Sequence, residues 1–187
     1  MSGSETISFL PLVILYVVTC LSIIYISIQD AKTMTIPAKA SFCIVSIHLI
    51  VNGLLIILYG QKTIFPLWPG TTMHPSSNLI SGFILGMATM LIIIVTRGKG
   101  LGRGDVLYLI LLGLMCGYSK SILALYIAIF TAVPFALYVA ITRKQFRNVK
   151  IPFVPFITTG IIGSLLLGDT AMLTIISKLS ALIYSMT

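Results

Sequence analysis

Charged residues, and acidic residues above all, are scarce in this chain. Only 9% of its 187 residues are charged and 58% are hydrophobic, with a mean hydropathy of +1.11. A soluble domain carries about a quarter charged residues, so these values exclude an ordinary water-soluble fold. The four acidic residues are Glu5, Asp30, Asp105 and Asp169. Any chemistry that needs a carboxylate must use this small set.

Common metal, thiol and nucleophile motifs are also lacking. The cysteines Cys20, Cys43 and Cys116 lie far apart in apolar runs, with no CxxC pair to indicate a zinc site or a redox dithiol. HExxH, GxSxG and GxxxxGK[ST] patterns are absent, so we predict no metal and no cofactor. His48, inside an apolar run, and His74, in a polar loop, are expected to be structural.

The net charge of +8 does not indicate a nucleic-acid partner. The basic residues stand in short clusters between apolar runs, a pattern typical of the loops of membrane proteins. We therefore expect no nucleic-acid binding and read the positive charge as a signal of membrane topology.

Apolar runs long enough to cross a bilayer recur along the chain. A membrane helix needs about 20 such residues, and the predicted spans are residues 9–28, 42–59, 79–96, 106–117, 122–141 and 153–167. We predict an all-α integral membrane protein, a polytopic bundle of about six transmembrane helices in a single membrane-embedded domain over residues 1–187. A tight turn is expected at residues 118–120. The tail, residues 171–187, is either an interfacial helix or a further span.

The basic residues predict the orientation of the bundle. Nine of the twelve fall in the loops after the first, third and fifth spans, and three fall on the other side. Lys and Arg are enriched in cytoplasmic loops, so the expected location is the cell inner (plasma) membrane with the N-terminus outside. Asp30 and Asp105 then share the cytoplasmic side, each at the edge of a span, whereas Glu5 and Asp169 lie on the opposite side.

The surroundings of Asp30 and Asp105 suggest a functional pair. Asp105 is expected to be the first residue of a helix, where free N–H groups favour a carboxylate, and glycine occupies every second position from 98 to 104. Two carboxylates that meet can share one proton, so that one activates water while the other acts as an acid. This is the mechanism of an aspartic protease. The alternative is two solvated boundary residues, paired with Lys32 or Arg103.

Three segments resemble motifs of the type IV prepilin peptidase family. Asp30 followed by Ile36–Pro37 resembles the first aspartate motif, and GRGD at Gly102–Asp105 resembles the second, GxGD. IPFVPF at Ile151–Phe156 is similar to the IPFGPF stretch that opens a later helix in these enzymes. The segments occur in the family's order. The resemblance implies a membrane-embedded aspartic endopeptidase with Asp30 and Asp105 as its catalytic pair.

The resemblance also implies supporting roles and a substrate. Residues expected to position the second aspartate or to shape the neighbouring turns and helix start are Gly102, Arg103, Gly104, Ile36, Pro37, Pro152, Phe153 and Pro155. The implied substrate is a type IV prepilin or pilin-like precursor, whose short basic leader is cut at the cytoplasmic membrane face. Membrane lipid is the other expected partner.

The chain departs from the family pattern in three places. Leu107 stands where the family often has Lys, and Val154 stands where the third motif has glycine. An N-terminal insertion with two CxxC pairs, linked to N-methylation of the cleaved pilin, is absent from this sequence. We therefore expect a short form without the methylation activity.

Two other functions remain open. Presenilin-like proteases place their first aspartate in a Tyr-Asp pair and carry a Pro-Ala-Leu motif, whereas Gln29 precedes Asp30 here and Pro-Ala-Leu is absent. A small ion or solute transporter subunit would hold its acids near the bilayer midplane. Two GxxxG patterns, Gly82/Gly86 and Gly113/Gly117, favour helix packing within one chain over a dimer interface, and the oligomeric state stays open.

Overall fold

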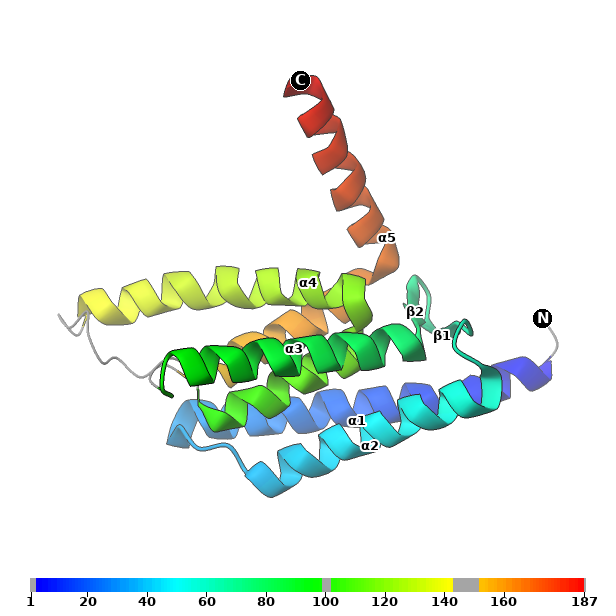
Figure 1. Cartoon of the computed structure of the whole chain (residues 1–187), viewed down its shortest axis with the longest axis horizontal. Coiled ribbons are helices and arrows are strands. Elements are labelled where there is room, and N and C mark those ends of the chain that lie inside the picture. The colour runs from blue at the N-terminus through cyan, green and yellow to red at the C-terminus, as the bar shows by residue number, and fades with distance from the viewer. Residues whose placement is uncertain (1–2, 99–101, 143–151, 187) are drawn as a thin grey trace.

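The computed structural model describes residues 3–98, 102–142 and 152–186 of the chain. Its elements are α1 (Gly3–Thr33), α2 (Ala38–Tyr59), β1 (Phe65–Trp68), β2 (Thr71–Met73), α3 (Pro75–Val95), α4 (Arg103–Thr142) and α5 (Val154–Met186). The helices lie roughly side by side in a bundle, and only the C-terminal part of α5 leaves it (Figure 1). The predicted helical architecture is confirmed.

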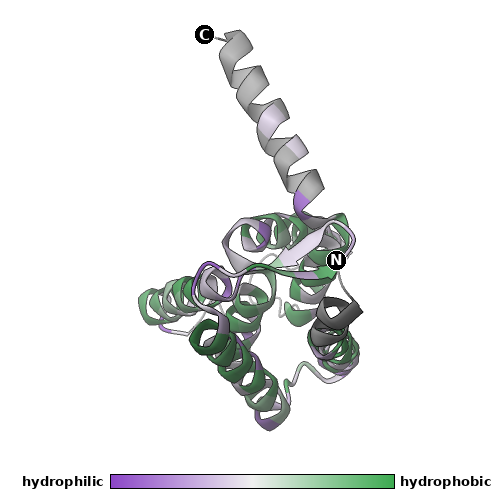
Figure 2. Ribbon diagram, turned by 90° about the vertical axis from the view of Figure 1, so that its right-hand side faces the viewer, coloured by the Kyte–Doolittle hydropathy of each residue, from purple (hydrophilic) through white to green (hydrophobic). Residues whose placement is uncertain are grey.

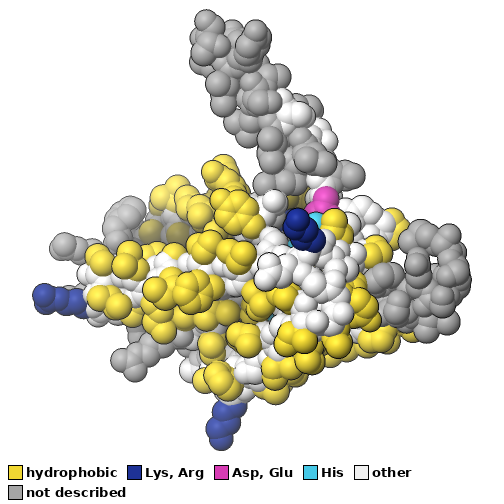
Figure 3. All heavy atoms as spheres, turned by 45° about the vertical axis from the view of Figure 1, so that its right-hand side comes forward, with side chains coloured by type: hydrophobic (Ala, Val, Ile, Leu, Met, Phe, Trp, Pro, Cys, Tyr) yellow, Lys and Arg dark blue, Asp and Glu magenta, His cyan; other side chains and the backbone are white. Residues whose placement is uncertain are grey.

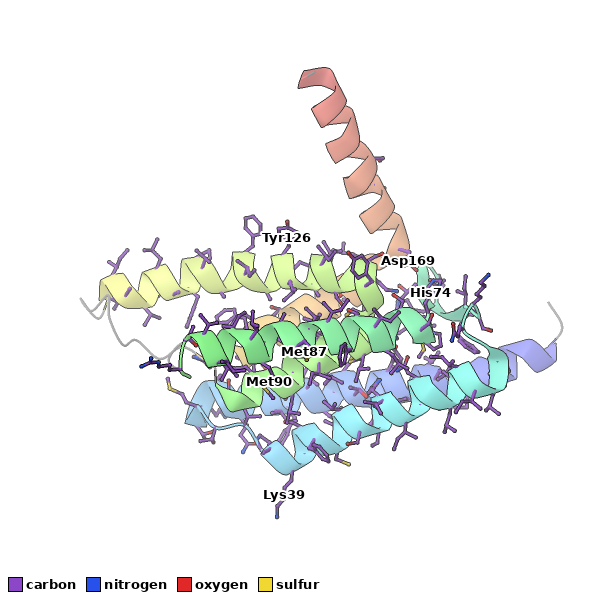
Figure 4. All side chains as sticks on the ribbon, viewed as in Figure 1. Lys39, His74, Met87, Met90, Tyr126 and Asp169 are labelled. Carbon is purple, nitrogen blue, oxygen red and sulfur yellow. The ribbon has the colours of Figure 1, made fainter. Side chains whose placement is uncertain are left out.

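Apolar side chains cover much of the outside of this bundle. Tyr126, Met87 and Met90 are 59%, 59% and 51% exposed, and Tyr126 points away from α4 (Figure 4). Hydrophobic side chains form broad areas over the helices (Figure 3), and the helices are apolar along most of their length (Figure 2). Soluble proteins rarely expose apolar patches of this extent. The outer surface therefore suits a lipid environment.

Four described helical stretches are long and apolar enough to cross a membrane. They are Leu10–Thr33, Ala38–Tyr59, Pro75–Val95 and Gly104–Thr142, and a shorter apolar helix covers Val154–Asp169. The prediction of a helical membrane protein is thus confirmed. The predicted number of about six spans is not confirmed by this measure.

Helix α4 consists of two segments that fold back on each other at Gly117, where φ is 68°. A β-carbon on Gly113 would contact the backbone of Gly82 and Ser81, and the Ser81 hydroxyl also donates to Ser121 at 2.9 Å. Eight residues of straight helix extend about 12 Å, so both contacts require the reversal seen in Figure 1. The reversal lies at Gly117, one residue before the turn expected at residues 118–120.

The glycine patterns serve contacts within the chain. Gly113 contacts the backbone of α3 at Gly82, and a β-carbon on Gly86 would lie 2.8 Å from Ile110 Cγ1. Close packing inside the chain is thus confirmed for these three glycines. Gly117 has a different task, because its positive φ forms the helix break.

A short hairpin, which the all-α prediction missed, lies in the loop between α2 and α3. Strands β1 and β2 pair antiparallel, and strands this short leave no periodic pattern in the sequence. Trp68 Nε1 and Thr71 Oγ1 both donate to the Leu165 carbonyl, at 3.3 and 3.0 Å. The hairpin thereby satisfies a carbonyl just before α5 breaks at Gly168, where φ is 66°.

The second part of α5 turns away from the bundle at this break (Figure 1). Gly168 packs directly on the hairpin turn at Gly70, and the Asp169 amide donates to the Gly70 carbonyl at 2.8 Å. The tail left open by the sequence is helical as far as Met186.

Candidate active site

Asp30 lies inside the last turns of α1, which continues past the predicted span at residues 9–28. The helix continues to Thr33, and the Met34 amide donates to the Asp30 carbonyl at 2.8 Å. Met34 then leaves the helix with a φ of 52°. The side chain of Asp30 is buried, with 4% exposure. The polar residues that begin at Gln29 thus start about one turn before α1 ends at Thr33.

The backbone amide of Val154 faces the carboxylate of Asp30. Val154 is the first residue of α5, and the first N–H groups of a helix have no partner within it. The helix dipole also favours a negative charge at this end. The N-terminus of α5 therefore compensates for the unfavourable position of Asp30 near the C-terminus of α1.

Asp105 binds the N-terminus of its own helix. It is the third residue of α4, not the first as expected. Its Oδ2 accepts the Gly102 amide at 3.0 Å, and its own amide donates to the Gly102 carbonyl at 3.1 Å. The bond from the Gly102 amide to the Asp105 side chain is one half of a capping box, in which the third helical residue binds the N-cap amide. A β-carbon on Gly102 would lie 3.2 Å from Oδ2, so glycine leaves room for the bond.

The two aspartates lie close enough for the charge of Asp30 to act on Asp105. The segments that carry them also pack together, because a β-carbon on Gly104 would lie 2.6 Å from Ile36 Cδ1. Asp30, Ile36, the Gly102–Asp105 turn and the start of α5 thus meet at one end of the bundle. The side chain of Arg103 lies outside the described residues.

The prolines named from the sequence flank this meeting point. Pro37 directly precedes α2, and its carbonyl accepts the amide and the hydroxyl of Ser41, at 3.1 and 3.2 Å. Pro155 is the second residue of α5, where the missing N–H removes no helical bond.

The residues just before α5 prepare its first turn. Pro152 and Phe153 precede the helix, and the Phe153 carbonyl accepts the Phe156 and Ile157 amides, at 3.1 and 3.2 Å. Ile151 lies outside the described residues. Phe153 therefore occupies the N-cap position, next to the amide of Val154 that faces Asp30.

Two buried hydroxyls near the pair escaped the sequence interpretation. Tyr108 is 1% exposed, and its hydroxyl feels the charge of Asp30. That hydroxyl faces Ser41 without completing a hydrogen bond of normal geometry. Thr158, one turn after Val154, has a buried Oγ1 with no partner among the described residues. The three-residue spacing from Asp105 to Tyr108, which places both on one helix face, was the available signal.

Asp169 belongs to a separate polar cluster. Its carboxylate pairs with Lys120 at 3.1 Å and accepts the Thr72 amide and hydroxyl at 2.8 and 2.7 Å. Along α5 it lies fifteen residues beyond Val154, about 22 Å in a helix, and Figure 4 places it near His74 and the hairpin. Asp169 is thus far from the Asp30 pair; the side chain of Glu5 lies outside the described residues.

Burial alone would raise the pKa of Asp169. The hydrogen bonds from Thr72 and the Lys120 charge outweigh that effect and hold the pKa below its ordinary value. Asp169 therefore stays ionised at neutral pH as part of a structural cluster. In the part of the chain that the structure describes, no three His, Cys, Asp or Glu side chains gather into a metal-binding group.

Fold and site together define a helical membrane protein in which two carboxylates from different helices lie at the same end of the bundle, near enough for one charge to act on the other. Residues 17–137 match the model of the type IV leader peptidase family. The match covers more than half of the chain, which therefore belongs to this family, and the family implies a peptidase. The matched segment includes both Asp30 and Asp105 and ends before α5 begins. No curated protein and no solved structure matches the chain.

Proposed function

We propose that this chain is a membrane-embedded aspartic endopeptidase that removes the short basic leader of type IV pilin-like precursors. The supporting observation is that Asp30 of α1 and Asp105 of α4 lie at the same end of the bundle, where the charge of Asp30 acts on Asp105 and Ile36 packs on Gly104. A peptidase needs a group that activates its nucleophile, and a pair of carboxylates can supply both the base and the acid.

The proposed reaction follows from the repulsion between the two carboxylates. Close like charges cannot both ionise readily, so the pair holds one proton. The ionised carboxylate takes a proton from water, whose oxygen attacks the scissile carbonyl carbon. The protonated carboxyl donates a hydrogen bond to the carbonyl oxygen as negative charge develops there. Collapse of the tetrahedral intermediate breaks the C–N bond, and the leaving amine takes up a proton from the pair.

The proposed membrane arrangement rests on the distribution of basic residues. We place the Asp30 end of the bundle at the cytoplasmic face of the plasma membrane and the N-terminus outside, because nine basic residues belong to the loops on the Asp30 side. We count the two segments of α4 and the first part of α5 as separate membrane segments, and the second part of α5 as interfacial. Residues 1–187 then form one membrane-embedded domain.

Leader cleavage in a co-expression assay tests the proposal. Asp30→Asn and Asp105→Asn, made at parental levels, should each reduce the processing rate of a pilin-like precursor at least about a hundredfold, because each removes one member of the acid–base pair. Asp169→Asn, at matched protein level, is the control and should process like the parent. Parental processing by either of the first two variants overturns the proposal.

The position of the cut separates this function from its alternatives. Mass spectrometry should find one cut between the leader and the hydrophobic segment of the precursor. Cuts within the hydrophobic segment would instead indicate a presenilin-like protease. Cation-dependent uptake into liposomes, unaffected by the two Asn substitutions, would indicate a transporter.

A further inference from the structure

The Tyr108 hydroxyl is a buried donor without a recipient beside the carboxylate pair. Tyr108 is 1% exposed, and its hydroxyl has no hydrogen-bond partner among the residues that the structure describes. Buried tyrosines normally place this group against a polar partner, because an unpaired buried hydroxyl destabilises the fold. The Tyr108 hydroxyl is therefore free to donate to a group at the carboxylate pair.

The nearest side-chain hydroxyl does not use the proton of Tyr108. Ser41 faces Tyr108, but its own hydroxyl donates to the Pro37 carbonyl at 3.2 Å. No bond of normal geometry joins the two hydroxyls. Ser41 is thus held by the turn before α2, and the proton of Tyr108 remains available.

Asp30 is the charged group that acts on the Tyr108 hydroxyl. The charge of Asp30 acts on the Tyr108 hydroxyl, while Asp105 precedes Tyr108 by three residues on the same face of α4. The Val154 amide of α5 also faces Asp30, and the Ser41 hydroxyl of α2 faces Tyr108. Asp105 and Tyr108 are therefore two titratable groups near Asp30.

We propose that Tyr108 is a positioning residue of the pair: its hydroxyl hydrogen-bonds to Asp30, directly or through the attacking water, and makes Asp30 the base and Asp105 the acid. The inference rests on the proposed peptidase function. In this arrangement Asp30 gains the Tyr108 hydroxyl as a donor and also has the Val154 amide facing it, whereas Asp105 has the Gly102 amide. The carboxylate with more donors holds the negative charge more readily.

Tyr108→Phe tests this inference because it removes only the hydroxyl. With purified enzyme and a precursor peptide in detergent micelles, we expect kcat to fall about ten- to a hundredfold and KM to stay within about twofold. The acidic limb of the pH–rate profile should move to higher pH, because Asp30 loses a donor that favours its ionised form. Tyr126→Phe, 59% exposed on the same helix, is the matched control and should leave all three unchanged.

Three outcomes decide the matter. A Tyr108→Phe enzyme with parental kcat and pH profile overturns the inference. A lower thermal stability with an unmoved pH profile also overturns it, because that result describes a structural role. Ser41→Ala should leave the pH–rate profile unchanged. If its acidic limb moved to higher pH instead, the positioning hydroxyl would be that of Ser41, and the inference for Tyr108 would be overturned. Failure of the peptidase proposal is separate, since Asp30→Asn and Asp105→Asn would then cleave normally.

Discussion

The side chain of Ile36 lies directly on Gly104, where a β-carbon would come within 2.6 Å of Ile36 Cδ1. This contact joins the turn after α1 to the first turn of α4. Asp30 precedes Ile36 by six residues, and Asp105 directly follows Gly104. The missing side chain of Gly104 therefore lets Ile36 pack against the first turn of α4, between the two aspartate-bearing segments.

Gly104→Ala should reduce leader cleavage about tenfold or more, because displacements of about 1 Å in a catalytic pair carry large rate penalties. Ile36→Val removes the Cδ1 atom that the new methyl group would strike. The double variant Gly104→Ala/Ile36→Val should therefore recover part of the lost rate, measured at equal enzyme levels. A double variant as slow as Gly104→Ala alone would show that this contact does not set the spacing.

The sequence predicted the local parts of the site better than its assembly. The glycine turn and the helix start at Asp105 are local, and both were recognised, although Asp105 is the third helical residue. Asp30 instead faces the backbone amide of Val154. A backbone amide has no sequence signature, and its position depends on how α5 packs against α1.

Gly117 shows the same limit for the fold. Its GxxxG spacing with Gly113 suggested helix packing, but one glycine contacts α3 and the other reverses the chain with a φ of 68°. Both uses require the absence of a side chain, so residue type alone does not separate them. The hairpin was missed because its three- and four-residue strands are too short to produce a period.

Gly113→Ala should destabilise the protein by about 1–3 kcal/mol, the usual range for overpacking. The new β-carbon would lie 2.5 Å from Gly82 Cα, and backbone cannot rotate away as a side chain can. Gly53→Ala is the control, because no atom lies within 4 Å of its β-carbon position, and alanine favours a helix by up to about 1 kcal/mol. Thermal unfolding in detergent should rank Gly53→Ala at or above the parent and Gly113→Ala below it. The reverse order would refute the close α3–α4 contact.

The Lys120–Asp169 pair predicts unequal effects of removing either partner. Lys120 is 5% exposed, so Asp169→Asn leaves a buried ammonium without its carboxylate. Lys120→Met removes the buried charge itself and should cost less. For Asp169→Asn we expect the free energy of unfolding to fall by about 1–2 kcal/mol, less than is usual for breaking a buried pair. The effect is smaller because the Asp169 side chain is 36% exposed and water screens its charge.

Acid should weaken the same cluster. The pKa of Asp169 lies below its ordinary value, so its stabilising contribution is complete above the unfolded-state pKa of about 3.9 and is lost as the pH falls through the lower folded-state pKa. The difference in melting temperature between the parent and Asp169→Asn should therefore narrow from pH 6 towards pH 3. A constant difference would mean that the charge of Asp169 contributes nothing.

Asn52→Leu should raise stability by about 1 kcal/mol, because it removes a buried oxygen that has no partner. Asn52 is fully buried on α2. Its Nδ2 donates to the His48 carbonyl at 2.8 Å, but its Oδ1 is unpaired among the described residues. Thr19→Val is the opposite case, since Thr19 Oγ1 bonds His48 Nε2 at 2.9 Å, and its loss should lower stability by about 1–2 kcal/mol. If Asn52→Leu melts earlier than the parent, its oxygen has a partner such as a buried water, and the site is wet.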